Sequence, residues 1–70
     1  MEMLETDIYQ SNDIGGNYCI FGRSGSRSNW KILCQKEGDR FAPVKFNERS
    51  DALRMAKALS RGIPNEYKLI

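Results

Sequence analysis

The clearest hydrophobic pattern in this chain lies near the C-terminus. Between residues 48 and 61, apolar residues recur at spacings of three and four, which is the period of a helix with one buried face. They are Ala52, Leu53, Met55, Ala56 and Leu59. Gly62 and Pro64 then end the pattern, because glycine readily adopts a left-handed conformation and proline cannot continue a helix. The sequence therefore predicts a helix over residues 48–61.

Two residues compete to cap the start of this helix. Asn47 and Ser50 each have a side-chain oxygen that can accept a hydrogen bond from an unpaired amide of the first turn. Glu48 and Asp51 place negative charge near the positive end of the helix dipole in either case. Because a helix of this length is marginal alone, its apolar face must be buried against the preceding strands.

Three segments before the helix have the composition of strands. Residues 17–23, 30–36 and 41–46 are rich in aromatic and β-branched residues. A glycine- and serine-rich loop over residues 22–29 joins the first two, and a tight turn around Gly38 joins the last two. The sequence predicts an α+β fold in which a three-stranded antiparallel sheet packs on one C-terminal helix (βββα). Short extra edge strands at the termini are compatible with this arrangement.

Alternation along the strands assigns each side chain to a face of the sheet. The first strand is apolar on both faces, and Pro43, which has no backbone donor, favours an edge or bulged position for the third strand. The residues expected to face the core are Trp30, Ile32, Cys34, Ala42, Val44 and Phe46. Those expected on a face left open by the helix are Lys31, Leu33, Gln35, Phe41, Lys45 and one of Tyr18 or Phe21.

The length of seventy residues predicts a single domain. Its N-terminal arm contains Leu4, Ile8 and Tyr9, which suit either an edge strand or a loose first turn, and the arm either covers the open face or leaves it free. The C-terminal tail is compatible with a short fourth strand that pairs with this arm. The predicted segments within residues 1–70 are the acidic arm (1–16), the sheet (17–46), the helix (48–61) and the tail (63–70).

Charge is divided unevenly along the chain. Residues 1–16 contain four acids and no base, whereas residues 17–70 contain eleven bases and five acids, a net charge of +6. A basic body favours nucleic acid or an acidic protein surface as a partner, and ordinary solubilising charge is the alternative. The chain has no apolar run of about 18 residues and no apolar signal-peptide core. We therefore expect no membrane partner and a cytoplasmic location.

Catalytic chemistry is poorly represented. The chain has no histidine, which is the commonest general base. It also has no serine in a glycine-flanked turn between a strand and a helix, and no glycine-rich phosphate-binding loop. Cys19 and Cys34 lie on neighbouring predicted strands, where two buried thiols are expected and a disulfide across the hairpin is the alternative. We expect no catalytic residue, no metal and no cofactor, and hence a binding module that is not an enzyme.

The candidate binding residues are the basic and aromatic residues of the sheet and its turns. Lysine and arginine neutralise phosphates, and exposed aromatic rings stack on bases. The candidates for nucleic-acid or partner binding are Arg23, Arg27, Lys31, Lys36, Arg40, Lys45, Phe41 and Tyr18. Trp30 offers another stacking ring, although a position in the core is favoured for it.

Three stretches of the chain also resemble a known family. Gly16-Asn17-Tyr18, Trp30-Lys31-Ile32 and the run from Phe46 to Leu53 resemble the three-stranded-sheet-plus-helix DNA-binding domains of plant ethylene-response factors and integrase arm-binding N-termini. The resemblance implies that side chains on the open sheet contact DNA. The implied contacts are Arg23, Arg27, Lys31 and Lys45. Residues 18–21 depart from this pattern, because they are more apolar than a DNA-reading strand.

In size and style, the chain resembles the small stand-alone proteins of phages and prophages, including host-takeover and anti-CRISPR-like inhibitors. We expect a module that acts on nucleic acid, or on a nucleic-acid-processing protein complex, through the open sheet face and the basic loop. One alternative is a stoichiometric inhibitor that docks on a host protein complex and presents a contiguous aromatic patch. Another is a homodimer that buries the open face against a second copy.

Overall fold

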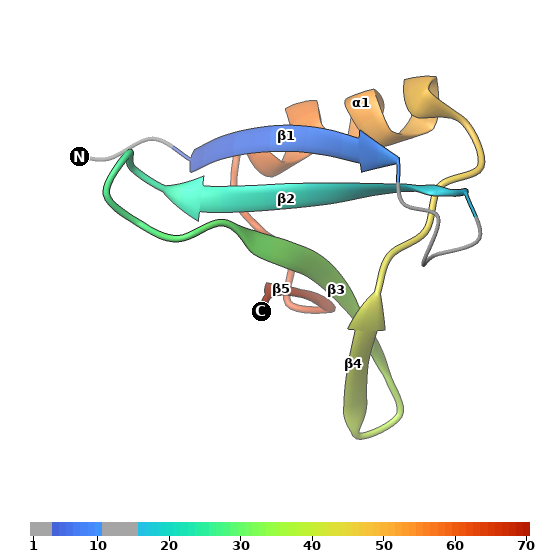
Figure 1. Cartoon of the computed structure of the whole chain (residues 1–70). Coiled ribbons are helices and arrows are strands. Elements are labelled where there is room, and N and C mark those ends of the chain that lie inside the picture. The colour runs from blue at the N-terminus through green and yellow to red at the C-terminus, as the bar shows by residue number, and fades with distance from the viewer. Residues whose placement is uncertain (1–3, 11–15) are drawn as a thin grey trace.

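The computed structural model describes residues 4–10 and 16–70 (Figure 1). The elements are β1 (Leu4–Gln10), β2 (Tyr18–Ser24), β3 (Lys31–Glu37), β4 (Arg40–Pro43), α1 (Arg49–Leu59) and β5 (Tyr67–Leu69). All strand pairs are antiparallel and together form a five-stranded sheet. The α+β class and the packing of one C-terminal helix on an antiparallel sheet are therefore confirmed.

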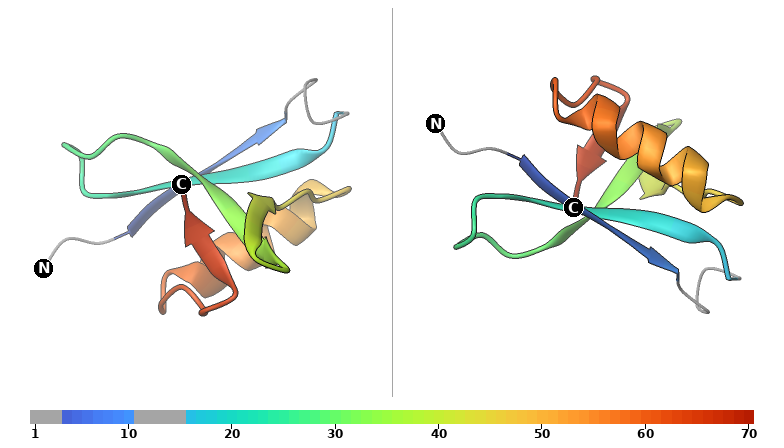
Figure 2. Two further views of the ribbon diagram at one scale, coloured as in Figure 1. Left: turned by 90° about the horizontal axis from the view of Figure 1, so that it is seen from below. Right: turned by 90° about the horizontal axis from the view of Figure 1, so that it is seen from above.

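Strand β3 is the centre of the sheet. Its first two residues pair with β2, and its second half pairs with β4. The Leu33 carbonyl accepts a hydrogen bond from the Val44 amide at 3.0 Å, whereas Ile32 exchanges two hydrogen bonds with Ile70. Since successive residues of a strand bond to opposite edges, β4 and β5 lie on opposite edges of β3. Figure 2 shows β4 and β5 at a wide angle to β1 and β2, so the sheet is strongly twisted along β3.

The turn between β3 and β4 occupies two residues. Gly38 has a φ of +65°, and no non-glycine residue in the described part of the chain has a positive φ. A positive φ followed by a negative one is the pattern of a type II′ hairpin turn, which favours glycine at the first central position. Glu37 and Arg40 pair directly on either side of it. The predicted turn around Gly38 is confirmed.

Edge strands are present at both termini, as expected, but the N-terminal one is long and the C-terminal one has another partner. β1 has seven residues and pairs with β2 along its whole length, from Leu4 opposite Ser24 to Gln10 opposite Tyr18. It lies beside β2 and does not cover the open face, because Leu4 and Ile8 pack against the core. β5 pairs with β3, and the predicted pairing with the N-terminal arm is wrong. The expectations for residues 1–3 and 11–15 lie outside the described residues.

The hydrophobic core lies between α1 and one face of the sheet. Its buried members are Ile20, Leu33, Ala52, Ala56 and Leu59. In Figure 1, α1 runs behind β1 and β2, so the opposite face of these strands is turned toward the viewer. The packing also depends on Gly22, where an added Cβ would lie 3.1 Å from a side-chain carbon of Leu69. The missing side chain at this position lets β5 approach β2.

The predicted faces of β3 are wrong. Leu33 is 0% exposed and packs in the core, whereas Trp30, assigned to the core by the sequence pattern, is 42% exposed. Gly22 pairs with Lys31 and Phe21 with Ile32, and directly paired residues share a face. The predicted outward set of Lys31, Leu33 and Gln35 therefore lies on the helix side. Residues 30–36 have apolar side chains on both faces, so their alternation does not show which face is buried. The pairing register with β2 decides which face of β3 packs against the helix.

The faces of residues 41–46 agree with the sequence prediction. Val44 and Phe46 pack against the core, and Ala42 is half-buried. Phe41 and Lys45 are exposed. Here the alternation is unambiguous, because the outward positions include a lysine and a proline.

Helix α1 is shorter than predicted at both ends. Its N-cap residue is Glu48, with extended backbone and no side-chain capping bond, so neither Asn47 nor Ser50 caps it. Because the cap is Glu48, Asn47 lies one residue before the helix start and Ser50 lies inside the first turn. Neither side chain is at the position from which it could accept a hydrogen bond from the free amides of that turn. At the other end, Gly62 has a φ of +133° and its amide donates to the Leu59 carbonyl at 3.0 Å. The helix therefore ends two residues before the predicted boundary at Arg61, and Gly62 turns the chain back onto its last residue.

The reversed faces of β3 lead to a test of stability. Leu33→Ala should lower the free energy of unfolding by about 2–5 kcal/mol, because it leaves a cavity under α1. Trp30→Ala should cost less than about 1.5 kcal/mol, since surface substitutions remove little buried area. Urea unfolding followed by far-UV circular dichroism measures both variants. A larger loss for Trp30→Ala than for Leu33→Ala would contradict the observed faces.

Candidate functional site

The uncovered side of the sheet, here called the open face, receives side chains from all five strands. Asp7 pairs with Phe21 and Tyr9 with Cys19, which places the odd-numbered residues of β1 and β2 on it. The pairs Phe21–Ile32 and Lys36–Phe41 extend it to β3 and β4. Its residues are Glu5, Asp7, Tyr9, Cys19, Phe21, Arg23, Trp30, Ile32, Cys34, Lys36, Phe41, Pro43, Lys68 and Ile70.

At the β1–β2 end of the open face, three aromatic rings and one carboxylate surround a shallow depression, here called the aromatic hollow. Asp7, Tyr9, Phe21 and Trp30 line its volume of about 310 Å³. The rings of Tyr9 and Phe21 meet edge-on, with centroids 6.0 Å apart at 76°. Tyr9 is 56% exposed. The hollow thus presents aromatic surface to solvent next to one acidic group.

Arg23 holds one side of this arrangement together. Its Nε donates to Glu5 Oε2 at 2.6 Å, and its guanidinium carbon lies 4.4 Å from the centroid of the Trp30 ring. Nη1 also donates to the Ser26 carbonyl at 3.4 Å. Arg23 is therefore on the open face as predicted, but its charge is balanced by Glu5 and its side chain positions Trp30. It is not a free cation for phosphate binding.

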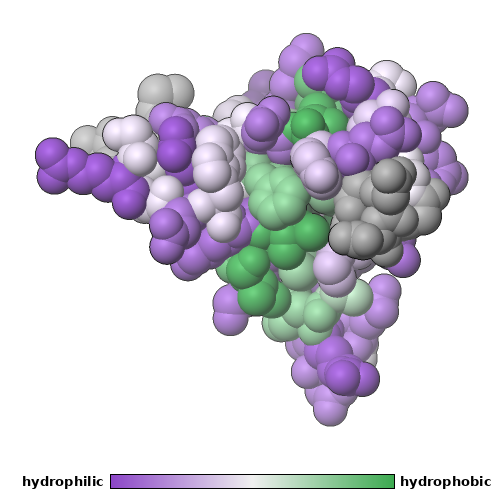
Figure 3. Space-filling view, viewed as in Figure 1, coloured by the Kyte–Doolittle hydropathy of each residue, from purple (hydrophilic) through white to green (hydrophobic). Residues whose placement is uncertain are grey.

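From the aromatic hollow, an apolar surface continues across β3. Ile32 lies opposite Phe21 and exchanges hydrogen bonds of 3.0 and 2.9 Å with Ile70, so the three side chains are neighbours on one face. Ile70 is 55% exposed. Figure 3 shows apolar surface extending across the middle of this view toward β4, bordered by polar side chains. The open face therefore has a contiguous apolar stripe, formed by Tyr9, Phe21, Trp30, Ile32 and Ile70.

Exposed cations gather at the other end of the open face, around β4. Lys36 pairs with Phe41, and Lys68 Nζ lies 5.8 Å from the centroid of the Phe41 ring. Arg40 and Lys45 are exposed on the turn and on the segment after β4. Within residues 4–10 and 16–70, none of these four cations is in an ion pair. Four exposed cations thus lie on and around this hairpin with Phe41. Lys36 and Lys68 lie beside Phe41 on the open face, whereas Arg40 pairs with Glu37 on the helix side. We call these four cations and Phe41 the basic end.

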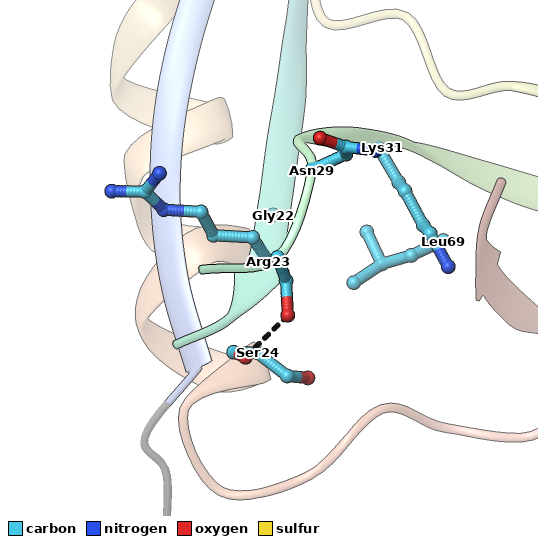
Figure 4. A pocket seen from close by; sticks show the side chains of 7 residues that line it. Gly22, Arg23, Ser24, Asn29, Lys31 and Leu69 are labelled. Carbon is cyan, nitrogen blue, oxygen red and sulfur yellow. Dashed lines mark hydrogen bonds between the residues drawn. The ribbon is translucent and has the colours of Figure 1, made fainter. Parts of the chain in front are cut away.

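The remaining candidates lie elsewhere. Tyr18 exchanges hydrogen bonds with Phe46 and packs against the core on the helix side, so of the two alternatives for the open face the structure selects Phe21. Arg27 is exposed in the loop between β2 and β3. Lys31 is exposed but lies on the helix side, where its chain extends along Leu69 (Figure 4). Neither Arg27 nor Lys31 joins the aromatic hollow or the basic end.

A second hollow lies next to Lys31, between the β2–β3 loop and β5. Its lining residues are Gly22, Arg23, Ser24, Ser28, Asn29, Lys31 and Leu69. Figure 4 shows the Arg23 guanidinium turned away from it toward β1, and the Ser28 hydroxyl donates to the Ser24 carbonyl at 2.7 Å. Of the two cationic residues that line this hollow, only Lys31 is therefore available to contact a ligand.

The two cysteines are free and buried. The segment 44–46 runs between β2 and the second half of β3, because Val44 bonds to Leu33 and Phe46 bonds to Tyr18. Cys19 and Cys34 therefore do not face each other across the hairpin, and the alternative of a disulfide is wrong. Burial raises the pKa of both thiols above their ordinary value of 9.0. A raised pKa keeps a thiol neutral and weakly nucleophilic.

Among the residues that the structure describes, no group of three or more histidine, cysteine, aspartate or glutamate side chains is arranged to hold a metal ion. In the same part of the chain, no helix is long and apolar enough to cross a membrane. Comparison with protein-family models, curated proteins and solved structures finds no match to this chain.

The open-face residues that were not among the predicted binding residues include Tyr9, Trp30, Lys68 and Ile70. Tyr9 could have been found from the alternation of Leu4, Thr6 and Ile8, which marks β1 as a strand with its odd positions outward. Trp30, Lys68 and Ile70 gave no comparable signal. Trp30 precedes its strand, and the face of β5 is set only by its register on β3.

The buried thiols lead to a pH prediction. Below pH 9 both thiols are neutral in the folded and unfolded chain, so their burial costs nothing extra. Above it, the unfolded chain ionises while the folded chain, with raised thiol pKa values, does not. The stability that the thiols contribute is therefore present below the unfolded pKa and is lost as the pH rises toward the folded pKa.

We expect the free energy of unfolding to fall between about pH 7 and pH 9.5, and to fall less in Cys19→Ala or Cys34→Ala. Urea unfolding at the two pH values measures the difference, and comparing each variant with the parent cancels the titration of tyrosines and lysines. An equal fall in parent and variants would show that the thiol pKa values are not raised.

Proposed function

We propose that this chain is a non-catalytic binding module that docks on another protein through the open face of its sheet. The observation that carries this proposal is the contiguous apolar stripe on the side that α1 leaves uncovered. Soluble proteins rarely expose connected apolar surface of this kind unless a partner covers it. Tyrosine and tryptophan, here Tyr9 and Trp30, are also the typical anchors of protein interfaces.

The charges around the aromatic hollow favour a protein over a nucleic acid at that end. Glu5 balances Arg23, and Asp7 adds a negative charge beside the very rings that would stack on bases. A nearby carboxylate repels a phosphate backbone. Ile32 and Ile70 are aliphatic and suit a close-packed protein contact. This combination supports a docking inhibitor, in the style of the small phage proteins that the chain resembles.

The proposal includes the location and the absence of catalysis. Two buried cysteines that remain unpaired suit a reducing compartment, and we place the module in the cytoplasm. Thiols kept neutral by burial are poor nucleophiles, which supports a binding role for this chain.

Substitution within the apolar stripe tests the docking. Tyr9→Ser combined with Ile70→Ser should retain the fold, because both side chains are largely exposed, and should weaken partner binding about 10- to 100-fold if each is an interface anchor. The immobilised parent captures the partner from a lysate of the native host, mass spectrometry identifies it, and calorimetry with the purified partner gives the dissociation constants.

Leu53→Ser provides the matched control, since Leu53 is an apolar residue 37% exposed on α1. It should bind the partner as the parent does. Equal affinity of the Tyr9/Ile70 double variant and the parent would contradict docking through the stripe. A dimer that forms from the purified parent in sedimentation equilibrium, and is lost in the double variant, would show instead that a second copy covers this face.

The basic end of the open face favours nucleic acid as a second candidate function. Lys36 and Lys68 lie beside Phe41, and Arg40 and Lys45 are exposed on the adjoining turn and segment. Cations next to an exposed ring are the combination that binds single strands. Glu37 and Asp39 lie on the same hairpin and reduce its net charge. Of the DNA contacts implied by the resemblance to sheet-based DNA-binding domains, Lys45 belongs to the basic end, whereas Lys31 lies on the helix side and Arg23 is paired with Glu5.

Mobility shifts with single-stranded DNA and RNA test this second function. Four phosphate contacts would give a slope of log affinity against log salt near about −2.8, and Lys36→Ala or Lys68→Ala should each reduce it by about 0.7. Arg23→Ala should leave the slope unchanged because Glu5 already balances Arg23. Binding that does not change with salt would rule out this mechanism.

A further inference from the structure

We infer that the aromatic hollow receives a cationic side chain, a lysine or an arginine, from the protein that docks on the open face. This inference rests on the proposed docking function and specifies one contact that the partner makes. The hollow defines what kind of group the partner must present at the β1–β2 end of the face.

The lining of the hollow matches the chemistry of a cation. The faces of aromatic rings carry partial negative charge and attract ammonium and guanidinium groups within about 6 Å. Tyr9, Phe21 and Trp30 supply three rings, and Asp7 supplies a full negative charge on the same wall. A volume of about 310 Å³ is at the lower limit of small-molecule pockets, which run from about 300 to 1,000 Å³, and therefore suits a single side chain.

The charge balance around the hollow leaves a negative site without its own cation. Glu5 and Arg23 cancel, since they form a 2.6 Å ion pair. Asp7 has no ion-pair partner in residues 4–10 and 16–70, and its Oδ1 accepts the Ile8 amide at 2.9 Å, which fixes the carboxylate. The local charge of these three side chains is thus −1, and a cation entering the hollow would neutralise it.

The chain already uses this chemistry with its own cations. The Arg23 guanidinium lies 4.4 Å from the Trp30 ring, and Lys68 lies over Phe41. Arg23 does not line the hollow, so it leaves this space to an external group. Its ion pair with Glu5 and its contact with Trp30 instead hold the tryptophan ring in place, which reduces the entropy cost of binding.

Trp30 is the single tryptophan of the chain, so its fluorescence and its indole N–H signal in NMR report directly on the hollow. The probes are N-acetyl-arginine amide and N-acetyl-lysine amide, with N-acetyl-citrulline amide as the neutral analogue of the arginine probe. One side chain with a few cation–π contacts should bind with a dissociation constant of about 1–10 mM. The citrulline probe should bind at least about 5-fold more weakly.

Asp7→Asn keeps the shape of the hollow and removes its charge. It should weaken binding of both cationic probes about 5- to 10-fold and leave the citrulline probe unchanged. Lys68→Gln, at the far end of the same face, is the matched control and should not alter probe binding. Citrulline binding as tight as arginine binding, an Asp7→Asn variant equal to the parent, or no saturable change in the Trp30 signals would each overturn the inference.

The complex with the captured partner separates this inference from the proposed function. Loss of affinity in the Tyr9/Ile70 double variant, with Asp7→Asn binding the partner as the parent does, would support docking and overturn a cationic occupant. A loss of affinity of about 5-fold or more in Asp7→Asn supports both, provided that high salt lowers the affinity of the parent to the level of the variant, because salt screens the attraction between Asp7 and the cation. Equal partner binding by the parent and both variants would overturn docking and the occupant together.

Discussion

Burial of the apolar stripe of α1 is the constraint on which the rest of this structure depends. A single short helix is unstable in water, and it covers only one side of a sheet. Ala52, Ala56 and Leu59 pack on Leu33 and Ile20, which assigns one face of β2 and β3 to the core. The opposite face then has no second layer among the described residues. Its apolar side chains remain at the surface because α1 is already used on the other side.

The missing side chain of Gly22 allows the close approach of β5 to β2. Gly22 leaves room for Leu69, whose side chain would otherwise meet a Cβ at about van der Waals contact or closer. β5 in turn fixes the second edge of β3, and with it the position of Ile70 beside Ile32. A backbone feature on the helix side thus helps to build the apolar stripe on the open face.

The open face has two chemically different ends, and each is built from pairs of neighbouring strands. At the aromatic hollow, the long-range ion pair of Glu5 and Arg23 balances a cation and orients Trp30, so aromatic surface and the Asp7 charge dominate. At the basic end, Lys36 and Lys68 lie beside Phe41, and no described acid forms an ion pair with either lysine. The unpaired cations of the open face therefore lie away from the aromatic rings of the hollow.

Local patterns in the sequence determined the helix, the turn at Gly38 and the alternation of residues 41–46, because each depends on neighbours a few positions apart. They also identified Lys36, Arg40, Phe41 and Lys45 as exposed candidates. The tertiary structure alone decided the faces of β3, since residues 30–36 are apolar on both sides and only the pairing of Phe21 with Ile32 selects one. It also decided that Arg23 is balanced by Glu5, 18 residues away, and that Tyr9 and Trp30 share a hollow. These contacts join strands that are distant in sequence, and no local period encodes the register that brings them together.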